Sequence, residues 1–340
     1  MATIVRYVNA ASVGGGTGQN PDITDPGDGT QAYASLSEWE AAEEANLITA
    51  GDIHECRVEG TTNDTTQLVI DTWTTGASNY IRIVALTTHR CDGVSGENSG
   101  TGYQLRGGTT RMLDIKEDYV RFEGFEVTTT STFAACAEVT SSSGVGSSDL
   151  HFDDMIFSCT SATVASDYGL NLGVACTYQI RNCLFNSHGH RGCRVVPATG
   201  SVEHSTAYGD GSLGFLVDAS SSISYSCAGG YTSEDFFTGG SAPGGDYNAS
   251  VDTSASTDFT NNIVSMTASN EWTSPNVDPA SADMSLLGSS QLVDAATGST
   301  EPFDIADTAR STPDIGCFEV AAVGGGGLPA GSLALLGVGV

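Results

Sequence analysis

The sequence predicts an all-β fold, a solenoid of short parallel strands. Composition is the first reason: 39% of residues are hydrophobic, 16% are charged and 42 of 340 are glycine, which is typical of short strands joined by small turns. The second reason is a repeat in the middle of the chain. Segments beginning GLNL, GCRV and GFLV start at residues 169, 192 and 214, at intervals of 23 and 22 residues.

Between these segments lies a second set of apolar residues in alternation. Each unit holds two or three short strands, separated by Gly, Ser, Asn or Asp corners. One unit cannot bury its own apolar face, whereas a stack of units can. About 22 residues per turn, with no helix between strands, favours a parallel β-helix over a propeller or a leucine-rich repeat. The alternating segments are VRFEGFEV at 120, LHFDDMIF at 150, YQIRNCLF at 178, SVEHSTAY at 201 and SISYSCAG at 222.

The two ends of the chain differ from the repeats, as solenoid caps do. Residues 1–50 are predicted to form a strand, a loop and a short helix that plugs the open end of the coils. Within YASLSEWEAAEEANLITA, apolar residues recur at helical spacing and Ser35 or Ser37 can cap the start. The β-helix is expected over residues 51–320. The apolar positions of the helix are Leu36, Trp39, Ala42 and Leu47.

Residues 321–340 are predicted to be an apolar C-terminal extension on a glycine tether. GGGG at 324–327 precedes LPAGSLALLGVGV, which is too short to span a bilayer because spanning needs about 20 apolar residues. Two alternatives stay open: the tail docks into another subunit, or it packs on its own domain. The residues expected to anchor it are Leu328, Leu333, Leu335, Leu336 and Val338.

Charge and cysteine content exclude several functions. The formal net charge is −29, which argues against nucleic acid and anionic membranes as partners. The nine cysteines form no CxxC pair, so we expect free buried thiols rather than a zinc site. The first residues lack the features of a signal peptide, which predicts synthesis without secretion.

Both ends of the chain resemble right-handed parallel β-helix proteins of the pectate-lyase-like superfamily. The first motif is RYVNAAS followed by GDGTQAYASLSEWEAAEEANLITAGD. The second is NVDPASADMSLLGSSQLVDAATG followed by DIADTARSTPDIGCFEV, where Cys317 stands at a position that usually holds a small residue. The resemblance covers residues 5–320 and implies a right-handed, single-stranded parallel β-helix. Such a fold hosts many activities.

Two further features, the glycine tether and the single-module size, point to a narrower group of β-helix proteins. These features are similar to β-helix proteins of tailed bacteriophages, which serve as spikes, fibres or capsid decorations. Enzymes of the superfamily act on polysaccharides: lyases use Ca²⁺ with an Arg or Lys base, and hydrolases use two carboxylates. The resemblance therefore implies two functions, a virion structural protein or a polysaccharide lyase or glycoside hydrolase.

The stretch FNSHGHRGCR concentrates histidine and arginine in an acidic chain. With Gly192 aligned to Gly169 and Gly214, the repeat places His188 beside Asp210 in the next coil and His190 near Asp167 in the previous one. Such a column can transfer protons or bind a sugar acid. A solvated corner between two coils is the favoured alternative. Nearby Arg191 and Arg194 are candidate substrate-binding residues.

Two other groups of carboxylates are weaker candidates for a functional site. Asp153 and Asp154 are adjacent in a predicted strand, so their side chains point to opposite faces and cannot act together. Asp22, Asp25 and Asp28 lie three residues apart in a Gly/Pro loop, which is a weak Ca²⁺ pattern that ordinary turns also produce.

The sequence thus favours a non-enzymatic structural protein of a virion, made in the host cytoplasm, with the extracellular space as the alternative location. Its expected partners are other virion subunits through the tail, cell-surface glycans and further copies of the chain. Neither a nucleic acid nor a membrane span is expected. No cofactor is expected apart from the weak Ca²⁺ pattern. The lyase or hydrolase is the alternative function.

Overall fold

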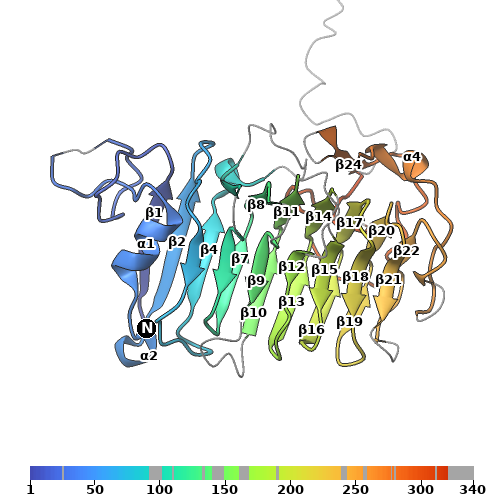
Figure 1. Ribbon diagram of the computed structural model, residues 1–340, viewed down its shortest axis with the longest axis horizontal. Helices are drawn as coiled ribbons and strands as arrows, with labels where there is room; N and C mark the ends of the chain where they lie inside the picture. The colour runs from blue at the N-terminus through green and yellow to red at the C-terminus, as the bar shows by residue number, and fades with distance from the viewer. Residues whose placement is uncertain are drawn as a thin grey trace, which may run out of the picture.

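The computed structural model shows a right-handed parallel β-helix whose coils stack along one axis (Figure 1). It describes residues 1–24, 27–91, 102–108, 111–131, 135–139, 149–160, 168–188, 191–238, 243–255, 259–276, 278, 281–310 and 312–320. Within the described part of the chain, the coils carry three parallel sheets, and each strand pairs with its equivalents in the neighbouring coils.

Sheet 1 has eight strands and sheets 2 and 3 have seven each, in the residues described. Sheet 1 contains β1 (Thr3–Asn9), β2 (Ile53–Glu59), β4 (Ile81–Ala85), β7 (Val120–Glu123), β10 (Asp149–Asp153), β13 (Thr177–Arg181), β16 (Thr199–Glu203) and β19 (Ser222–Ser224). Sheet 2 contains β5 (Gln104–Gly107), β8 (Glu126–Thr129), β11 (Ile156–Cys159), β14 (Leu184–Ser187), β17 (Thr206–Gly209), β20 (Cys227–Gly229) and β22 (Ala249–Ser250). Sheet 3 contains β3 (Leu68–Ile70), β6 (Leu113–Ile115), β9 (Ala137–Val139), β12 (Tyr168–Asn171), β15 (Arg191–Val195), β18 (Leu213–Val217) and β21 (Glu234–Thr238).

The interior of the coils is a stack of identical or similar side chains. Because strands in adjacent coils lie about 4.8 Å apart, residues at equivalent positions touch. Phe122 stacks on Phe152 with ring centroids 5.2 Å apart, and Phe157 stacks on Phe185 at 5.3 Å. All nine cysteines are buried with free thiols, as the sequence predicted.

The repeated glycines mark the start of successive strands of sheet 3. Gly169, Gly192 and Gly214 are in register, as the 22–23-residue repeat predicted. A Cβ at Gly192 would lie 2.4 Å from the carbonyl oxygen of Gly214 and 2.9 Å from the hydroxyl of Tyr231. The corner between sheets 2 and 3 has no room for a side chain there, which is the physical reason for the repeat.

The N-terminal end is closed by short helices. Helix α1 (Leu36–Glu43) starts at Ser35, whose hydroxyl accepts a hydrogen bond from the Glu38 amide at 3.0 Å. The predicted helical segment is broken after α1, and α2 (Leu47–Ala50) follows. Trp39 is fully buried and stacks on Trp73 with centroids 5.7 Å apart. Two further helical turns are η1 (Thr87–His89) and α4 (Ala268–Glu271).

One residue per coil turns the chain from sheet 1 to sheet 2 in a left-handed conformation. Asp154, Asn182, His204, Tyr225 and Tyr247 all have φ between 47° and 58°. Asp, Asn and His tolerate this region best among residues with a side chain. His204, Tyr225 and Tyr247 also stack on one another, with centroid distances of 4.9 and 5.7 Å. We call this column the left-handed corner.

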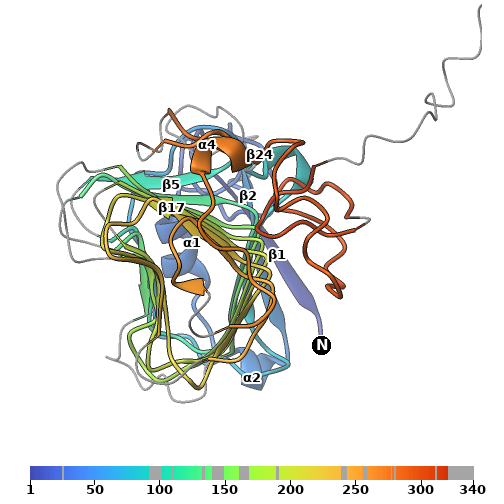
Figure 2. The same cartoon turned by 90° about the vertical axis from the view of Figure 1, so that its right-hand side faces the viewer.

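The C-terminal segment does not add coils. After the hairpin of β23 (Trp272–Ser274) and β24 (Asp283–Leu286), residues 289–310 and 312–320 run back along the outside of the coils (Figure 2). We call this segment the strap. It buries Leu292, Ile305 and Ile315 and makes a second hydrophobic cluster with the outer side of sheet 2, where Ile156 and Leu184 lie.

Candidate functional site

Polar side chains collect on the outer face of sheet 1. In β4, β7, β10 and β13 the apolar residues point inward, so the residues between them face outward. Strand register aligns these outward residues in two rows that run along the coil axis. The first row is Arg82, Arg121, His151 and Gln179. The second row is Glu123, Asp153 and Arg181.

These rows line a groove with a volume of about 380 Å³. This is within the usual range of small-molecule sites, about 300–1,000 Å³. The groove is a feature of the sheet itself, and its other lining residues include the ring of Tyr80 at one end. The lining residues are Tyr80, Arg82, Arg121, Phe122, Glu123, His151, Asp153, Gln179 and Arg181.

Each of the two carboxylates in the groove forms an ion pair with an arginine. Arg82 bridges Glu55 and Glu123 at 2.8 and 2.5 Å. Arg181 donates from Nε to Asp153 at 2.8 Å. Acid–base hydrolysis needs one carboxyl that delivers a proton, and neither Glu123 nor Asp153 is free of a cation. The arrangement instead fixes donors and acceptors side by side for a ligand rich in hydroxyl groups.

The remaining groove residues provide further donors. The guanidinium of Arg121 lies 3.9 Å from the centroid of the Tyr80 ring, and its Nη2 is 3.7 Å from Asp149. The Nε atom of Arg121 is buried and has no hydrogen-bond partner among the described residues. His151 Nε2 lies 2.9 Å from Asp149. The Arg121 side chain as a whole is 32% exposed and lines the groove, so its guanidinium, though not the buried Nε, can contact a ligand there.

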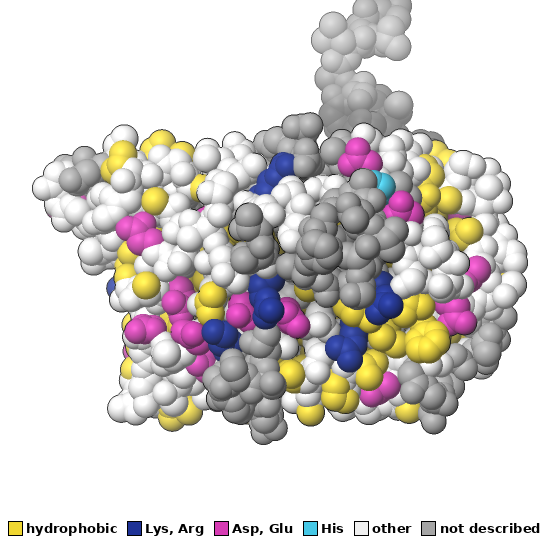
Figure 3. All heavy atoms as spheres, in the orientation of Figure 1, with side chains coloured by type: hydrophobic (Ala, Val, Ile, Leu, Met, Phe, Trp, Pro, Cys, Tyr) yellow, Lys and Arg dark blue, Asp and Glu magenta, His cyan; other side chains and the backbone are white. Residues whose placement is uncertain are grey.

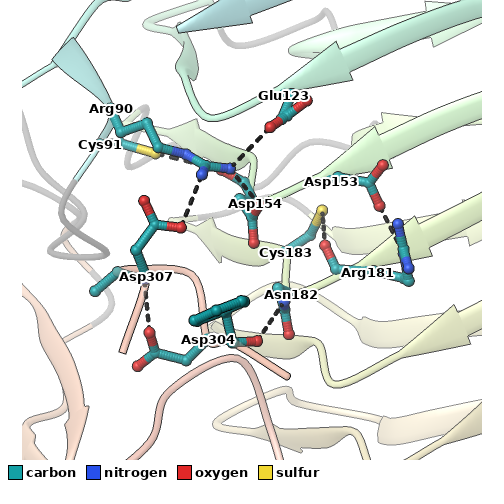
Figure 4. Close-up of polar contacts among 12 residues, drawn as sticks. Arg90, Cys91, Glu123, Asp153, Asp154, Arg181, Asn182, Cys183, Asp304 and Asp307 are labelled. Atoms are coloured by element: carbon teal, nitrogen blue, oxygen red, sulfur yellow. Dashed lines mark hydrogen bonds and ion pairs between the residues drawn. The ribbon is translucent and has the colours of Figure 1, made fainter. Parts of the chain in front are cut away.

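A carboxyl with a raised pKa lies at the left-handed corner, next to the groove but not in its lining. Burial raises the pKa of Asp154 to about 7, against the opposing effect of Arg90. Arg90 binds Asp154, and its other contacts are Glu123 at 3.4 Å and Asp307 at 2.8 Å (Figure 4). Asp153 and Asp154 hold different partners, Arg181 and Arg90, but not for the predicted reason: strand β10 ends at Asp153, and Asp154 is a corner residue with a φ of 57°.

The left-handed corner is covered by the strap. Asn182 donates to the carbonyl of Phe303 at 2.9 Å, and His204 Nδ1 lies 3.2 Å from the carbonyl oxygen of Asp314. Burial lowers the pKa of His204 to about 3, so this histidine is neutral beside Arg310. The corner histidine is a structural contact of the strap and is not offered to a ligand.

The structure places only part of the predicted His–Asp column. His188 Nδ1 lies 3.2 Å from Asp210 Oδ2, so the two side chains are adjacent, as the repeat predicted. They lie at the corner between sheets 2 and 3, away from the groove. His190 and Asp167 fall outside the described residues. Arg191 and Arg194 lie on the outer face of sheet 3, where both guanidinium groups contact the Tyr168 ring.

The predicted calcium loop shows an ordinary turn at the aspartate that can be described in detail. Asp28 accepts hydrogen bonds from the amide and hydroxyl of Thr30 at 3.1 and 2.7 Å, and these bonds lower its pKa. Asp22 is exposed, and Asp25 lies outside the described residues. Whether Ca²⁺ binds this loop stays a prediction. The tail residues Leu328, Leu333, Leu335, Leu336 and Val338 also lie outside the described residues.

A different set of acidic groups lies at the N-terminal cap. Carboxylate oxygens of Glu40, Glu44 and Asp71 are within 4.8 Å of one another. Donors already contact this set: the indole of Trp73 donates to Glu40 at 3.3 Å, and the hydroxyl of Thr72 donates to Glu44.

Within the described ranges, no helix is both long and apolar enough to cross a membrane.

No protein-family model matches the sequence, and no curated protein matches it. Among solved structures, the chain is similar to the crystal structure of the pectate lyase Pel9A, with 15% sequence identity and a TM-score of 0.45. The similar region covers 93% of this chain and 96% of that one. The parallel β-helix itself follows from the strand pairing described above.

Proposed function

We propose that this protein binds a hydroxyl-rich polysaccharide in the sheet 1 groove without cleaving it, as a structural component of a virion. The observation that supports binding is the pair of rows in the groove, where arginine, histidine, glutamine and carboxylate side chains follow one another at the spacing of the coils. Charged groups make stronger hydrogen bonds to hydroxyls than neutral groups do. A polymer of sugar units can meet the same kind of contact in each successive coil.

The absence of turnover is proposed because Glu123 and Asp153 each hold an arginine. One observation favours the alternative, a lyase or glycoside hydrolase. Glu123 and Asp153 are paired in register on adjacent strands, about 4.8 Å apart, which is near the separation of about 5–5.5 Å used by retaining glycosidases. The two functions therefore share a groove and differ in whether bonds break.

The test measures binding and cleavage together. Purified protein is titrated calorimetrically with dextran, a neutral galactan and polygalacturonate, and the mixtures are assayed for new reducing ends and for unsaturated sugars. Arg121→Ala should weaken binding at least about tenfold, because a hydrogen bond to a charged group contributes about 1.5–3 kcal/mol. Arg111→Ala, which removes an arginine outside the groove, should leave binding unchanged.

Two results would contradict the proposal. If the wild type produces new reducing ends and Glu123→Gln does not, the groove cleaves the polysaccharide and the protein is an enzyme rather than an adhesin. If the wild type and Arg121→Ala bind the tested polysaccharides equally well, the groove is not the binding site.

The virion role is supported by the sequence of the C-terminal extension, an apolar segment on a glycine tether. Deleting residues 324–340 should abolish incorporation into particles while circular dichroism of the β-helix stays unchanged. Incorporation of the truncated chain at the wild-type level would contradict this anchoring role.

A further inference from the structure

The outer face of sheet 3 carries a small ordered patch. Register places two columns of three side chains on neighbouring coils, so that Arg194, Leu216 and Phe237 follow one another along the coil axis. Leu213 and Glu234 are paired in the same way in the second column, which begins with Arg191. The sheet 3 patch consists of Arg191, Leu213, Glu234, Arg194, Leu216 and Phe237.

The two arginines of the patch are held by neutral groups. Arg191 donates to the hydroxyls of Ser212 at 2.6 Å and Tyr168 at 2.7 Å, and Arg194 donates to the side-chain carbonyl of Asn171 at 3.0 Å. Their guanidinium carbons lie 5.2 and 5.9 Å from the centroid of the Tyr168 ring. These contacts fix the direction of both cations without neutralising them.

Neither guanidinium lies within 4.0 Å of a carboxylate in the described ranges. By contrast, Arg82 and Arg181 on sheet 1 and Arg111 beside sheet 3 all hold carboxylates. The chain has 41 acidic and 12 Lys or Arg residues, so a cation without a carboxylate is unusual here. The patch is suited to receive negative charge from another molecule.

The rest of the patch is apolar and accessible. The side chain of Phe237 is 39% exposed, and Leu213 and Leu216 are partly exposed. Figure 3 shows hydrophobic side chains gathered on the face over β18 and β21, next to two basic ones. Arginine and aromatic residues beside leucine are typical of the centre of protein–protein interfaces, from which charged carboxylates are largely absent.

The order of residues in the two columns is self-complementary. A two-fold axis in the plane of the interface, parallel to the strands and passing over Leu213 and Leu216, brings two such faces together, reverses the coil order and leaves each column opposite its own copy. Arg191 then faces Glu234 of the second copy, Arg194 faces Phe237 of the second copy, and each leucine meets its own counterpart at the centre. We propose that two copies of this chain associate through the sheet 3 patch as a closed dimer.

The proposed contacts are favourable for independent reasons. Each Arg191–Glu234 pair supplies the carboxylate that Arg191 lacks, and each Arg194–Phe237 pair places a cation against a ring. A two-fold contact repeats both and then closes, so association ends at two chains. The patch contains one carboxylate per copy, which limits repulsion between two strongly acidic molecules.

Charge reversal tests this pairing directly. Sedimentation equilibrium at about 0.15 M salt, where the Debye length is about 8 Å, gives the dimer dissociation constant. Arg191→Glu and Glu234→Arg should each raise it at least about 100-fold, because each creates two like-charge contacts. The double variant restores opposite charges and should return to within about tenfold of the wild type.

Controls separate association from folding. Glu203→Arg makes the same charge change on sheet 1 and should leave the dissociation constant unchanged. Phe237→Ser changes an exposed ring, so the chain should fold normally and dimerise more weakly. Circular dichroism and thermal unfolding verify that every variant is folded.

Three results would overturn the proposal. One is a wild-type chain that stays monomeric up to the highest soluble concentration. Another is a folded double variant that dimerises as weakly as the single variants. The last is binding of polygalacturonate to the monomer that is lost in Arg191→Glu, which would assign the arginines to an anionic glycan.

Discussion

Arg310 holds the strap to the coils, and its removal gives a sharp stability prediction. The side chain is 0% exposed, and all five of its N–H donors are directed at acceptors. Nε donates to the carbonyl of Phe303 at 3.1 Å, and Nη2 donates to Asn182 Oδ1 at 3.2 Å and to the carbonyl of Gly316 at 3.0 Å. Nη1 donates to the carbonyl of Asp314 at 3.1 Å and to Glu319 Oε2 at 3.4 Å.

The perturbation is Arg310→Met, which keeps the buried volume and removes the charge. It leaves Glu319, only 3% exposed, without its cation, and this loss costs about 3–5 kcal/mol for a buried pair. An unfolding entropy of about 2.1 cal/mol/K per residue makes 1 kcal/mol equivalent to about 1.4 °C of Tm for 340 residues, so Tm should fall by roughly 4–7 °C. Removing both charges, in Arg310→Met with Glu319→Gln, should recover part of the loss because no unpaired charge remains.

Differential scanning calorimetry measures the change in Tm, and limited chymotrypsin digestion followed by mass spectrometry locates the opening, because the strap contains Leu292, Phe303 and Phe318 and no basic residue apart from Arg310. Cleavage should appear first within residues 289–320, since the strap opens more easily than the coils. A Tm within 2 °C of the wild type, together with an unchanged digestion pattern, would refute the assignment of Arg310 as the main fastening of the strap.

Three further predictions concern the coils. Gly192→Ala should lower stability by about 1–3 kcal/mol in urea unfolding, because its Cβ would meet a backbone oxygen at 2.4 Å, whereas Gly288→Ala, with open space around it, should have little effect; equal effects would contradict the crowding argument. Burial raises the pKa of Asp235 to about 6, so between about pH 4 and pH 6 the native state binds more protons than the unfolded state, whose aspartates titrate near 3.9. The free energy of unfolding should therefore fall as pH rises through this window, and the fall should be smaller in Asp235→Asn. Identical pH profiles of the wild type and the variant would show that Asp235 does not cause the fall. The nine buried thiols should be inert to Ellman's reagent in the native protein and react fully in guanidinium chloride, and rapid native labelling would disprove their burial.

The sequence was sufficient to predict the β-helix, the buried cysteines and the glycine register, because a period of 22–23 residues fixes which positions stack. The same period predicted that His188 meets Asp210. The groove was not predicted. Its first coils are longer, since Ile81 pairs with Val120 and Phe122 with Phe152, so the repeat did not align Arg82 with Arg121. Alternation within IRIVA and VRFEG was the signal that could have found it.

The strap could not be derived from local pattern at all. Its partners are distant in sequence: Arg90 and Asp307 are 217 residues apart. The resemblance pointed to a common ending, DIADTARSTPDIGCFEV, without indicating where it packs. The structure gives the reason for that motif, because Arg310, Asp314 and Glu319 tie the segment to itself and to Asn182.

The route of the strap also has a consequence for the order of folding. Coils have contacts mainly with their neighbours, so they can form one after another as the chain is synthesised, and an exposed stack can open one coil at a time from its end. The strap is the last described segment to be made, and it joins coils that are far apart along the axis. Its docking is therefore a late, high-contact-order step of folding, which is completed only after the coils that it joins have formed.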